Sequence, residues 1–423
     1  MTLRRVAATL RSLISDESGN VLTFAAIGLP LLFGCAALAV DTAQWVFAKR
    51  ELQAAADAAA TAGVYGLIQA DDMESAVDKS VASNPDLPPN RSVIATRSPD
   101  RDKPDEFAVR VQIASPVKMT FTSMFLRKAP VIDVEATATV VENGEFCAFA
   151  IGSDPETGVR IDPSANVAMD CGVATNASSK DAIEADGSAS VEADRVVAFG
   201  GIAADGIKSS RIRQYGVRQK DPLAGRDPPL VPNTGCPNVT VNSDAALTNG
   251  GKVTLQPGCY GNLALDGPVF LADGEYILNR GNFVVGPTGD VTCRACTIFL
   301  TSEQAATDPW SVGKMQIDSH ARVKLAAPTQ GPNAGLLVYQ DRRAEGAHDA
   351  IENILGGNSF SEFKGLLYFP SETLRVDGTF TPDVRCGRFI GRRLVFQGRV
   401  LISKGCSDSS VMNFRGTEVR LIS

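Results

Sequence analysis

The chain has 423 residues and a formal net charge of −7. That length is enough for two or three domains, and the acidic balance argues against a nucleic-acid partner, since such binding depends mainly on Lys and Arg contacts with phosphates. Aromatic residues make up only 6% of the chain, whereas it contains 38 Gly and 23 Pro. This composition is typical of a protein built from many short strands.

A single, uncleaved membrane span is predicted near the N-terminus. Residues Val21–Val40 carry no charge, and at about 1.5 Å per residue a helix of this length crosses a hydrocarbon core about 30 Å thick. Arginines at positions 4, 5 and 11 precede the span, which favours a cytoplasmic N-terminus at residues 1–20. Two alternatives are a cleaved signal peptide, which has a shorter apolar region, and a prepilin-type leader cleaved at Gly19, which would place Glu where Phe24 stands.

The span is predicted to continue directly into an extramembrane helical segment, residues 41–83. Apolar residues recur at near-helical spacing as far as Gln69, which predicts one long helix with the span. A second helix is predicted at Met73–Ser83, because Asn84-Pro85 follows and stops it.

Residues 84–142 are expected to form a small α+β module. Alternating and β-branched runs such as FAVRVQIA and VIDVEATATVV predict its strands. Between them, a short helix at Met119–Leu126 is expected to pack Phe121, Met124 and Phe125 on the sheet.

Residues 147–423 predict a right-handed parallel β-helix, which makes the fold class multidomain and mainly β. Short apolar runs alternate with small turn residues, and Ser164–Val167 falls on Ser188–Val191 after a shift of 24 residues. By the same shift, Val173 falls on Val197. Such a repeat buries its inward face only when neighbouring coils stack. Loop insertions are expected near 205–235, which is Pro-rich, and near 341–361, which is charged.

Eight of the nine cysteines follow the span and form an even set, which predicts disulfides in an oxidising compartment. Neighbour spacing favours four pairs: Cys147 with Cys171, Cys236 with Cys259, Cys293 with Cys296, and Cys386 with Cys406. The C-x-x-C of the third pair could instead be a redox motif or half of a zinc site. No second C-x-x-C exists, and the two histidines show no ligand spacing.

Asp41 at the membrane exit and the run RELQAAADAAATAG (Arg50–Gly63) resemble the N-terminal signature of the TadE/TadG-like pilus-assembly proteins. The matching residues are Asp41, Arg50, Leu52, Gln53, Ala55, Ala56, Asp57, Ala58 and Ala59. The stretch GLLYFPSETLRVDGTF and the cysteines after it resemble the ending of the variant with a β-helical outer domain. The resemblance implies an envelope protein of the tight-adherence (Flp/Tad) pilus system, anchored in the inner membrane as an assembly factor, pilus anchor or minor pilin-like component.

Many TadG-like relatives carry a von Willebrand A domain with a metal-binding D-x-S-x-S motif, and Asp186–Ser190 matches that motif literally. The metal site requires the motif after a buried strand of an α/β sheet, whereas here it falls in register with Asp162–Asn166 of the repeat. We therefore interpret it as a turn. No metal site, no cofactor and no catalytic residue is predicted.

Stacked carboxylates keep an enzymatic alternative open. The 24-residue shift superposes Asp162 on Asp186 and Asp170 on Asp194, and glycoside hydrolysis uses two carboxylates at a set separation. Such ladders also arise as solvated turns, and the motifs of pectin-degrading β-helices are absent. The arginines of a local basic cluster are expected to face solvent, with binding of an acidic polysaccharide as the alternative; they are Arg385, Arg388, Arg392, Arg393 and Arg399.

The function expected is that of a non-enzymatic, single-pass protein of the bacterial inner membrane, with its C-terminal domain periplasmic or surface-directed. Its partners would be other Tad pilus or envelope proteins, bound through the N-terminal helix, together with the membrane. A glycan or surface ligand on the β-helix is a further option. The alternatives are a membrane-tethered β-helix enzyme acting on polysaccharide and an adhesin that binds glycans or surfaces without chemistry.

Overall fold

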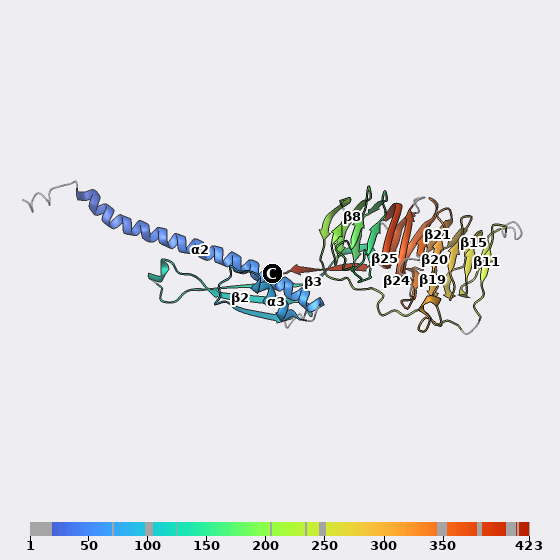
Figure 1. The fold of residues 1–423 in the computed structure, drawn as a ribbon, viewed down its shortest axis with the longest axis horizontal. Coiled ribbons are helices and arrows are strands. Elements are labelled where there is room, and N and C mark those ends of the chain that lie inside the picture. Colours follow the sequence, from blue (N-terminus) through green and yellow to red (C-terminus); the bar gives the residue numbers. More distant parts are fainter. Residues whose placement is uncertain are drawn as a thin grey trace, which may run out of the picture. The chain divides into compact units, whose positions relative to one another are not determined.

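The computed structural model describes residues 19–69, 72–97, 105–124, 126–203, 205–232, 235–244, 251–344, 353–378, 383–402, 412 and 414–422. The chain divides into two compact units (Figure 1). Unit 1 comprises residues 1–141 and 419–423, and unit 2 comprises residues 142–418.

Unit 1 combines two helices with an antiparallel sheet. Helix α2 (Gly19–Gln69) contains the apolar segment and the Ala-rich run without a break, although Pro30 lies inside it. Helix α3 (Met73–Ala82) begins at Asp72, whose side chain accepts a hydrogen bond from the backbone N–H of Ser75 at 3.1 Å. This is an N-cap, which satisfies one of the donors left free at the start of a helix.

The sheet of unit 1 consists of β1 (Ser92–Arg97), β2 (Val109–Pro116) and the first part of β3 (Val131–Ala150). Strand β2 lies between the other two and pairs antiparallel with each. Alternate residues of β2 are buried, as expected for a sheet with one face covered. Helix α2 covers that face, because Ala56 and Ala59 are as fully buried as the β2 residue Val111.

The segment between β2 and β3 does not form the short helix predicted at Met119–Leu126. Only a single 3-10 turn, η1 (Thr122–Met124), is present. Phe121 is 42% exposed and Met124 is 82% exposed, so the prediction that they pack on the sheet is wrong. Hydrogen bonds to Asp41 on α2 hold the start of the turn. Phe125 lies outside the described residues.

Unit 2 is mostly β and its strands pair in parallel. After β3, its first series of strands is β4 (Val159–Ile161), β5 (Asn166–Met169), β6 (Gly172–Thr175), β7 (Ile183–Ala185), β8 (Ser190–Ala198), β9 (Ile202–Ala203) and β10 (Ile207–Arg213). Strand β4 pairs with β7 and β5 pairs with β8, each in the 24-residue register of the repeat. Between β6 and β8 the register is one residue shorter, and Val173 pairs with Val196 instead of the predicted Val197.

The second series runs from β11 to β23. Its strands are β11 (Val239–Val241), β12 (Val253–Leu255), β13 (Gly258–Tyr260), β14 (Leu263–Leu265), β15 (Pro268–Leu271), β16 (Gly274–Asn279), β17 (Phe283–Val285), β18 (Asp290–Cys293), β19 (Cys296–Thr301), β20 (Met315–Ile317), β21 (Arg322–Ala326), β22 (Leu336–Gln340) and β23 (Asn353–Leu355). From β11 to β20, each strand pairs in parallel with the strand three places later. The chain therefore returns to the same edge after every third strand.

The two series meet at the C-terminal strands. Strand β24 (Glu362–Gly378) pairs with β21, β22 and β23 of the second series, and with β25 (Asp383–Ile402). Strand β25 pairs in turn with β3, β4 and β5. Figure 1 shows β25 between β8 and the strands β20 and β21. The last strand is β26 (Phe414–Leu421). The order along the stack therefore differs from the order along the chain.

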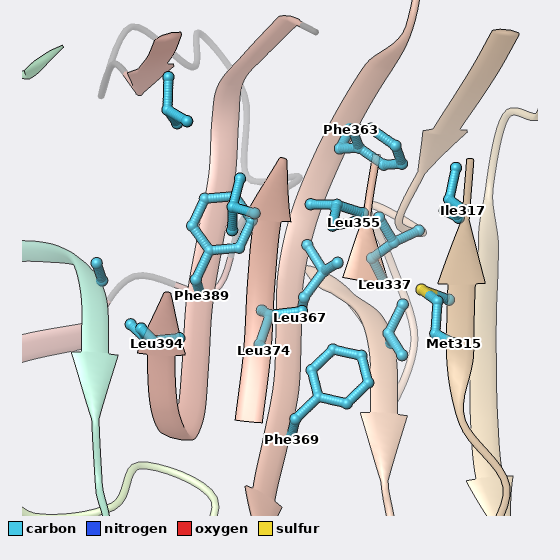
Figure 2. Close-up of a cluster of buried hydrophobic side chains, with 14 of the residues drawn as sticks. Met315, Ile317, Leu337, Leu355, Phe363, Leu367, Phe369, Leu374, Phe389 and Leu394 are labelled. Atoms are coloured by element: carbon cyan, nitrogen blue, oxygen red, sulfur yellow. The ribbon is translucent and has the colours of Figure 1, made fainter. Parts of the chain in front are cut away.

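A continuous apolar core runs through unit 2. In Figure 2, Met315 and Ile317 of β20 lie near Leu355, Phe363 and other side chains of the neighbouring strands. The core residues alternate with outward-facing ones along short strands, as in the burial of β14 and β17, which is the pattern of a strand with one buried face. The expected loop regions near 205–235 and 341–361 contain strands at β10 and β23 respectively.

Candidate functional site on the N-terminal helix

The first half of α2 exposes its apolar side chains. Phe24 is 74% exposed, Ile27 72% and Leu31 70%, and Cys35 is an exposed free thiol. A soluble protein does not place large apolar side chains on all sides of an exposed helix, because their transfer from water is favourable. Among the described residues, this is the one helix long and apolar enough to cross a membrane.

Asp41, directly after the predicted span, is fully buried in the protein. Its Oδ2 atom accepts hydrogen bonds from the backbone N–H groups of Phe121 at 2.9 Å and Thr122 at 2.6 Å. Burial acts to raise the pKa of this carboxyl, but the hydrogen bonds from Thr122, Phe121 and Thr120 outweigh it and hold the pKa below its ordinary value. Asp41 therefore caps η1 from another element and ties the loop to the helix.

Two further contacts fasten the same loop to the next turn of α2. The indole Nε1 of Trp45 donates to the carbonyl of Lys118 at 3.2 Å. The hydroxyl of Thr120 donates to Oε1 of Gln44 at 3.3 Å. Together with Asp41, these residues lie on the first turn after the apolar segment, so the loop is held at the end of the predicted span.

The Ala-rich run packs on the protein's own sheet and on α3. Leu52, Ala55, Ala56 and Ala59 are buried. A side chain at Gly63 would lie 2.8 Å from Val109 of β2 and 2.9 Å from Val77 of α3. The small residues therefore allow three backbones to approach closely, and the rigid contact with the sheet is one use of the run.

Gln53 and Asp57 form a polar link at the edge of this contact. The Gln53 amide donates to Asp57 Oδ1 at 2.9 Å and to the carbonyl of Glu135 on β3 at 2.9 Å. Both side chains are half-buried. Gln53 thus positions the Asp57 carboxylate, the charge that interrupts the Ala face. The hydrogen bond of Gln53 to the Glu135 carbonyl could not be predicted from sequence spacing.

The opposite face of α2 is exposed in the described part of unit 1. Ala43, Phe47, Arg50, Ala54 and Ala58 are exposed, and Phe47 is 62% exposed. They lie four, three, four and four residues apart, which places them on one face of a helix. Of the nine motif residues, Arg50 and Ala58 belong to this outward face, whereas the other seven are buried or half-buried.

Three disulfides lie between described cysteines of unit 2. They join Cys147 to Cys171, Cys236 to Cys259 and Cys293 to Cys296, with Cα atoms 5.7, 4.9 and 6.1 Å apart. Cys386 is also disulfide-bonded, and its expected partner Cys406 lies outside the described residues. Cys293 and Cys296 therefore pair with each other, and the structure does not present them as two free thiols.

The carboxylates considered for catalysis lie in turns and at ion pairs. The carbonyl of Asp162 accepts from Ala165 N–H at 2.9 Å, and that of Asp186 accepts from Ala189 N–H at 3.1 Å. The two turns are equivalent in consecutive repeats, and Gly187 within the D-x-S-x-S match has a positive φ of 63°. Asp194 pairs with Arg195 at 3.0 Å. Within the described part of the chain, no three Asp, Glu, His or Cys side chains gather closely enough to hold a metal ion.

The expectation that the basic cluster faces solvent is wrong for Arg388, which is fully buried in β25. Burial lowers its pKa, opposed by the charges of Glu145 and Asp170. Arg392 and Arg393 are half-buried and pair with acidic residues at 3.0 and 3.1 Å. Arg399 is exposed, and the side chain of Arg385 lies outside the described residues. Residues 387–391 are all buried, so both faces of β25 are covered at Arg388, which a local charge count did not reveal.

A buried polar network in unit 2 had no sequence signal. Glu372 is 4% exposed and accepts hydrogen bonds from Gln340 and Asn353, both at 2.8 Å. Lys314 pairs with the same carboxylate at 3.4 Å. These residues lie on or beside four different strands, so only the stacking of the strands brings them together. Its hydrogen bonds and the ion pair offset the free-energy cost of burying the Glu372 carboxylate.

Among the described residues, one exposed apolar helix fits a membrane anchor, and the C-terminal region is mostly β with parallel strands. These two features define the class as a membrane-anchored protein with a C-terminal β domain. Residues 19–71 match the family model described as "Putative Flp pilus-assembly TadE/G-like". The N-terminal helix is therefore a TadE/G-like domain, and the resemblance read from its motif is confirmed. No curated protein and no solved structure gives a significant match to the chain.

Proposed function

We propose that this protein is a non-enzymatic, membrane-anchored component of the Flp/Tad pilus system. Its role would be that of an assembly factor, a pilus anchor or a minor pilin-like component. The observation that carries the proposal is the TadE/G-like match over residues 19–71, on a helix whose first half exposes apolar side chains and whose second half is fixed to a folded module.

The proposed topology places the N-terminus in the cytoplasm, residues 21–40 in the inner membrane, and both the module and unit 2 in the periplasm or directed to the surface. Arginines before the span support this orientation. Disulfides in unit 2 support it independently, because they persist in oxidising compartments such as the periplasm.

Unit 2 is proposed to be a right-handed parallel β-helix, extending from about residue 147. Its support is the return of the chain to the same edge after every third strand, with parallel pairing throughout the second series. A stack of this kind offers a long rigid surface. We propose that it serves as a spacer and recognition surface for envelope partners.

Partner helices are proposed to bind the outward face of α2, where Phe47, Ala54 and Ala58 are exposed. Small residues let a second helix approach closely. The test is co-purification of Flp/Tad components with the full chain from membranes, comparing wild type with Ala54→Arg/Ala58→Arg. The double variant should lose them while remaining folded, because surface substitutions change stability by only about 0.5 kcal/mol.

The matched control is Glu74→Arg/Asp78→Arg on the exposed face of α3, which should keep its partners. Equal recovery of the same components with the α2 variant and with wild type would contradict the proposed face. Loss of components in both double variants would point to a general effect of added charge instead.

A further inference from the structure

The segment Lys118–Val131, which comprises the loop between β2 and β3 in unit 1 and the first residue of β3, exposes apolar side chains at the membrane end of the module. Met124 is 82% exposed, Val131 63%, Phe121 42% and Leu126 41%. A folded module normally buries most of its large apolar side chains. Several of them exposed together mark a contact surface. We call this segment the apolar loop.

The apolar loop is also basic. Lys118, Arg127 and Lys128 are exposed, and residues 118–131 contain no Asp or Glu. The chain as a whole carries a net charge of −7, so this local excess of cations runs against its composition. Apolar side chains flanked by Lys and Arg are the combination that binds the surface of an anionic bilayer.

The position of the loop relative to the span is fixed by hydrogen bonds. Asp41, the first residue after the apolar segment, accepts from the N–H groups of Phe121 and Thr122. One turn later, Trp45 donates to the carbonyl of Lys118. In Figure 1 the loop between β2 and β3 reaches beyond the sheet, alongside α2. The loop is therefore held at the level where the helix leaves the hydrocarbon core.

We propose that the apolar loop is a second membrane contact, with Phe121, Met124 and Leu126 inserted at the boundary between headgroups and acyl chains. Arg127 and Lys128 would then meet anionic phospholipid headgroups of the same leaflet. The proposal rests on the proposed function, since it requires residues 21–40 to span the membrane. Trp45, with its half-buried ring and donated N–H, suits the same interface.

The consequence is a fixed orientation of unit 1 on the membrane. A single helix allows a domain to rotate about the helix axis, whereas a second contact on one side of that axis prevents it. The apolar loop is bound to the Asp41 side of α2, so the outward face with Ala54 and Ala58 would be presented in one direction within the membrane plane.

The test uses a nitroxide spin label on the full chain in vesicles of phosphatidylethanolamine and phosphatidylglycerol. The label is placed at Met124→Cys in a Cys35→Ser background, without reduction of the disulfides. Lys79→Cys on α3 in the same background is the control, because that side chain is exposed and lies on the second helix. Cys35 of the wild-type chain, an exposed thiol within the span, reports whether the helix is inserted.

The proposal predicts that the label at position 124 lies about 5–10 Å below the phosphates, accessible to oxygen and protected from a water-soluble nickel complex. The label at position 79 should show the opposite. Adding Arg127→Gln/Lys128→Gln should move the label at 124 toward water and lower its ratio of oxygen to nickel accessibility severalfold.

A label at 124 that is as accessible to nickel as the label at 79, while Cys35 is in the hydrocarbon, would overturn the second contact and leave the span intact. Nickel access at Cys35 would overturn both. Dipolar coupling between labels at 124 of two chains, without oxygen access, would show that a second copy covers the loop and would equally overturn the proposal.

Discussion

Asp41 shows how a single carboxylate can fix the geometry of a membrane-proximal module. Its two hydrogen bonds from backbone N–H groups join residues 80 and 81 positions apart in the chain. A carboxylate is suited to this role because it only accepts, and its charge strengthens the bonds it receives. The buried Asp41 is therefore a structural member of the family motif.

The pKa of Asp41 lies below its ordinary value in the folded chain, so folding favours the charged form. Its contribution to stability is therefore complete above the unfolded pKa, about 3.9, and is lost as the pH falls through the lower folded pKa. Asp41→Asn should be less stable than wild type at neutral pH, and the difference should shrink below about pH 4.

Hydrogen exchange of the Phe121 and Thr122 amides across pH measures this effect in the full chain. Asp133→Asn, an exposed carboxylate on β3, is the matched control. A constant difference between Asp41→Asn and wild type down to the lowest pH would contradict the assignment.

Glu372 carries a comparable role in unit 2, where it accepts from Gln340 and Asn353 and pairs with Lys314. Glu372→Ala should cost about 3–5 kcal/mol, because it removes the buried carboxylate that accepts from Gln340 and Asn353 and pairs with half-buried Lys314. Glu156→Ala, which removes a partner of Arg393 at a half-exposed pair, should cost at most about 1 kcal/mol. Denaturant unfolding of unit 2 in the full chain measures both, and equal costs would contradict the network's importance.

At the scale of elements, close packing of α2 on α3 decides the cost of small changes. A side chain at Gly66 would lie 2.6 Å from the Ala76 side chain and 2.6 Å from the Asp72 carbonyl oxygen. Gly66→Ala gains about 1 kcal/mol in helix propensity. The Asp72 carbonyl oxygen is a backbone atom that cannot easily move away, however, and overpacking costs about 1–3 kcal/mol. We expect a net loss of stability.

Gly34→Ala in the same helix is the control, since nothing lies within 4 Å of its added side chain. In detergent micelles, the melting temperature of unit 1 should fall for Gly66→Ala and stay unchanged for Gly34→Ala. An increase in melting temperature for Gly66→Ala would show that α3 moves away at little cost.

The long apolar helix, its continuation to Gln69 and the 24-residue register of β4 with β7 could be predicted from sequence, because each rests on a local pattern. The η1 turn could not, since its conformation depends on Asp41 from a distant element. Arg388 was misjudged because its burial depends on strands that pair with β25 from both sides. Contacts of high sequence separation leave no local pattern.

At the scale of the whole chain, a long connection joins the first series of strands of unit 2 to the second. Strand β10 ends at Arg213 and β11 begins at Val239, at the two ends of the stack. Residues 219–226 of this connection are held by side chains on or next to β6, β22 and β24. Tyr368 donates to Asp221 at 2.7 Å, Tyr339 donates to the carbonyl of Arg226 at 2.5 Å, and Asn176 exchanges two hydrogen bonds with Gln219.

Asn176→Ala should loosen this connection, because the buried N–H and carbonyl of Gln219 would lose their partner, at a cost of about 1–3 kcal/mol. Limited proteolysis between residues 214 and 235 should accelerate in the variant. Asn238→Ala, which removes an exposed hydrogen bond to Asn262, should leave the rate unchanged. Unchanged cleavage in the Asn176 variant would show that the remaining contacts suffice.

Helix α2 is proposed to anchor this protein among Flp/Tad components, and photocross-linking in cells tests this role most directly. A photoreactive residue at Ala54 or Ala58, on the outward face, should form adducts with another Flp/Tad envelope component in the membrane fraction. The same residue at Asp78 on α3 should not. Recovery of the chain from the soluble fraction would contradict the anchoring role of α2. Adducts at position 54 only with proteins unrelated to the pilus would contradict its placement among Flp/Tad components.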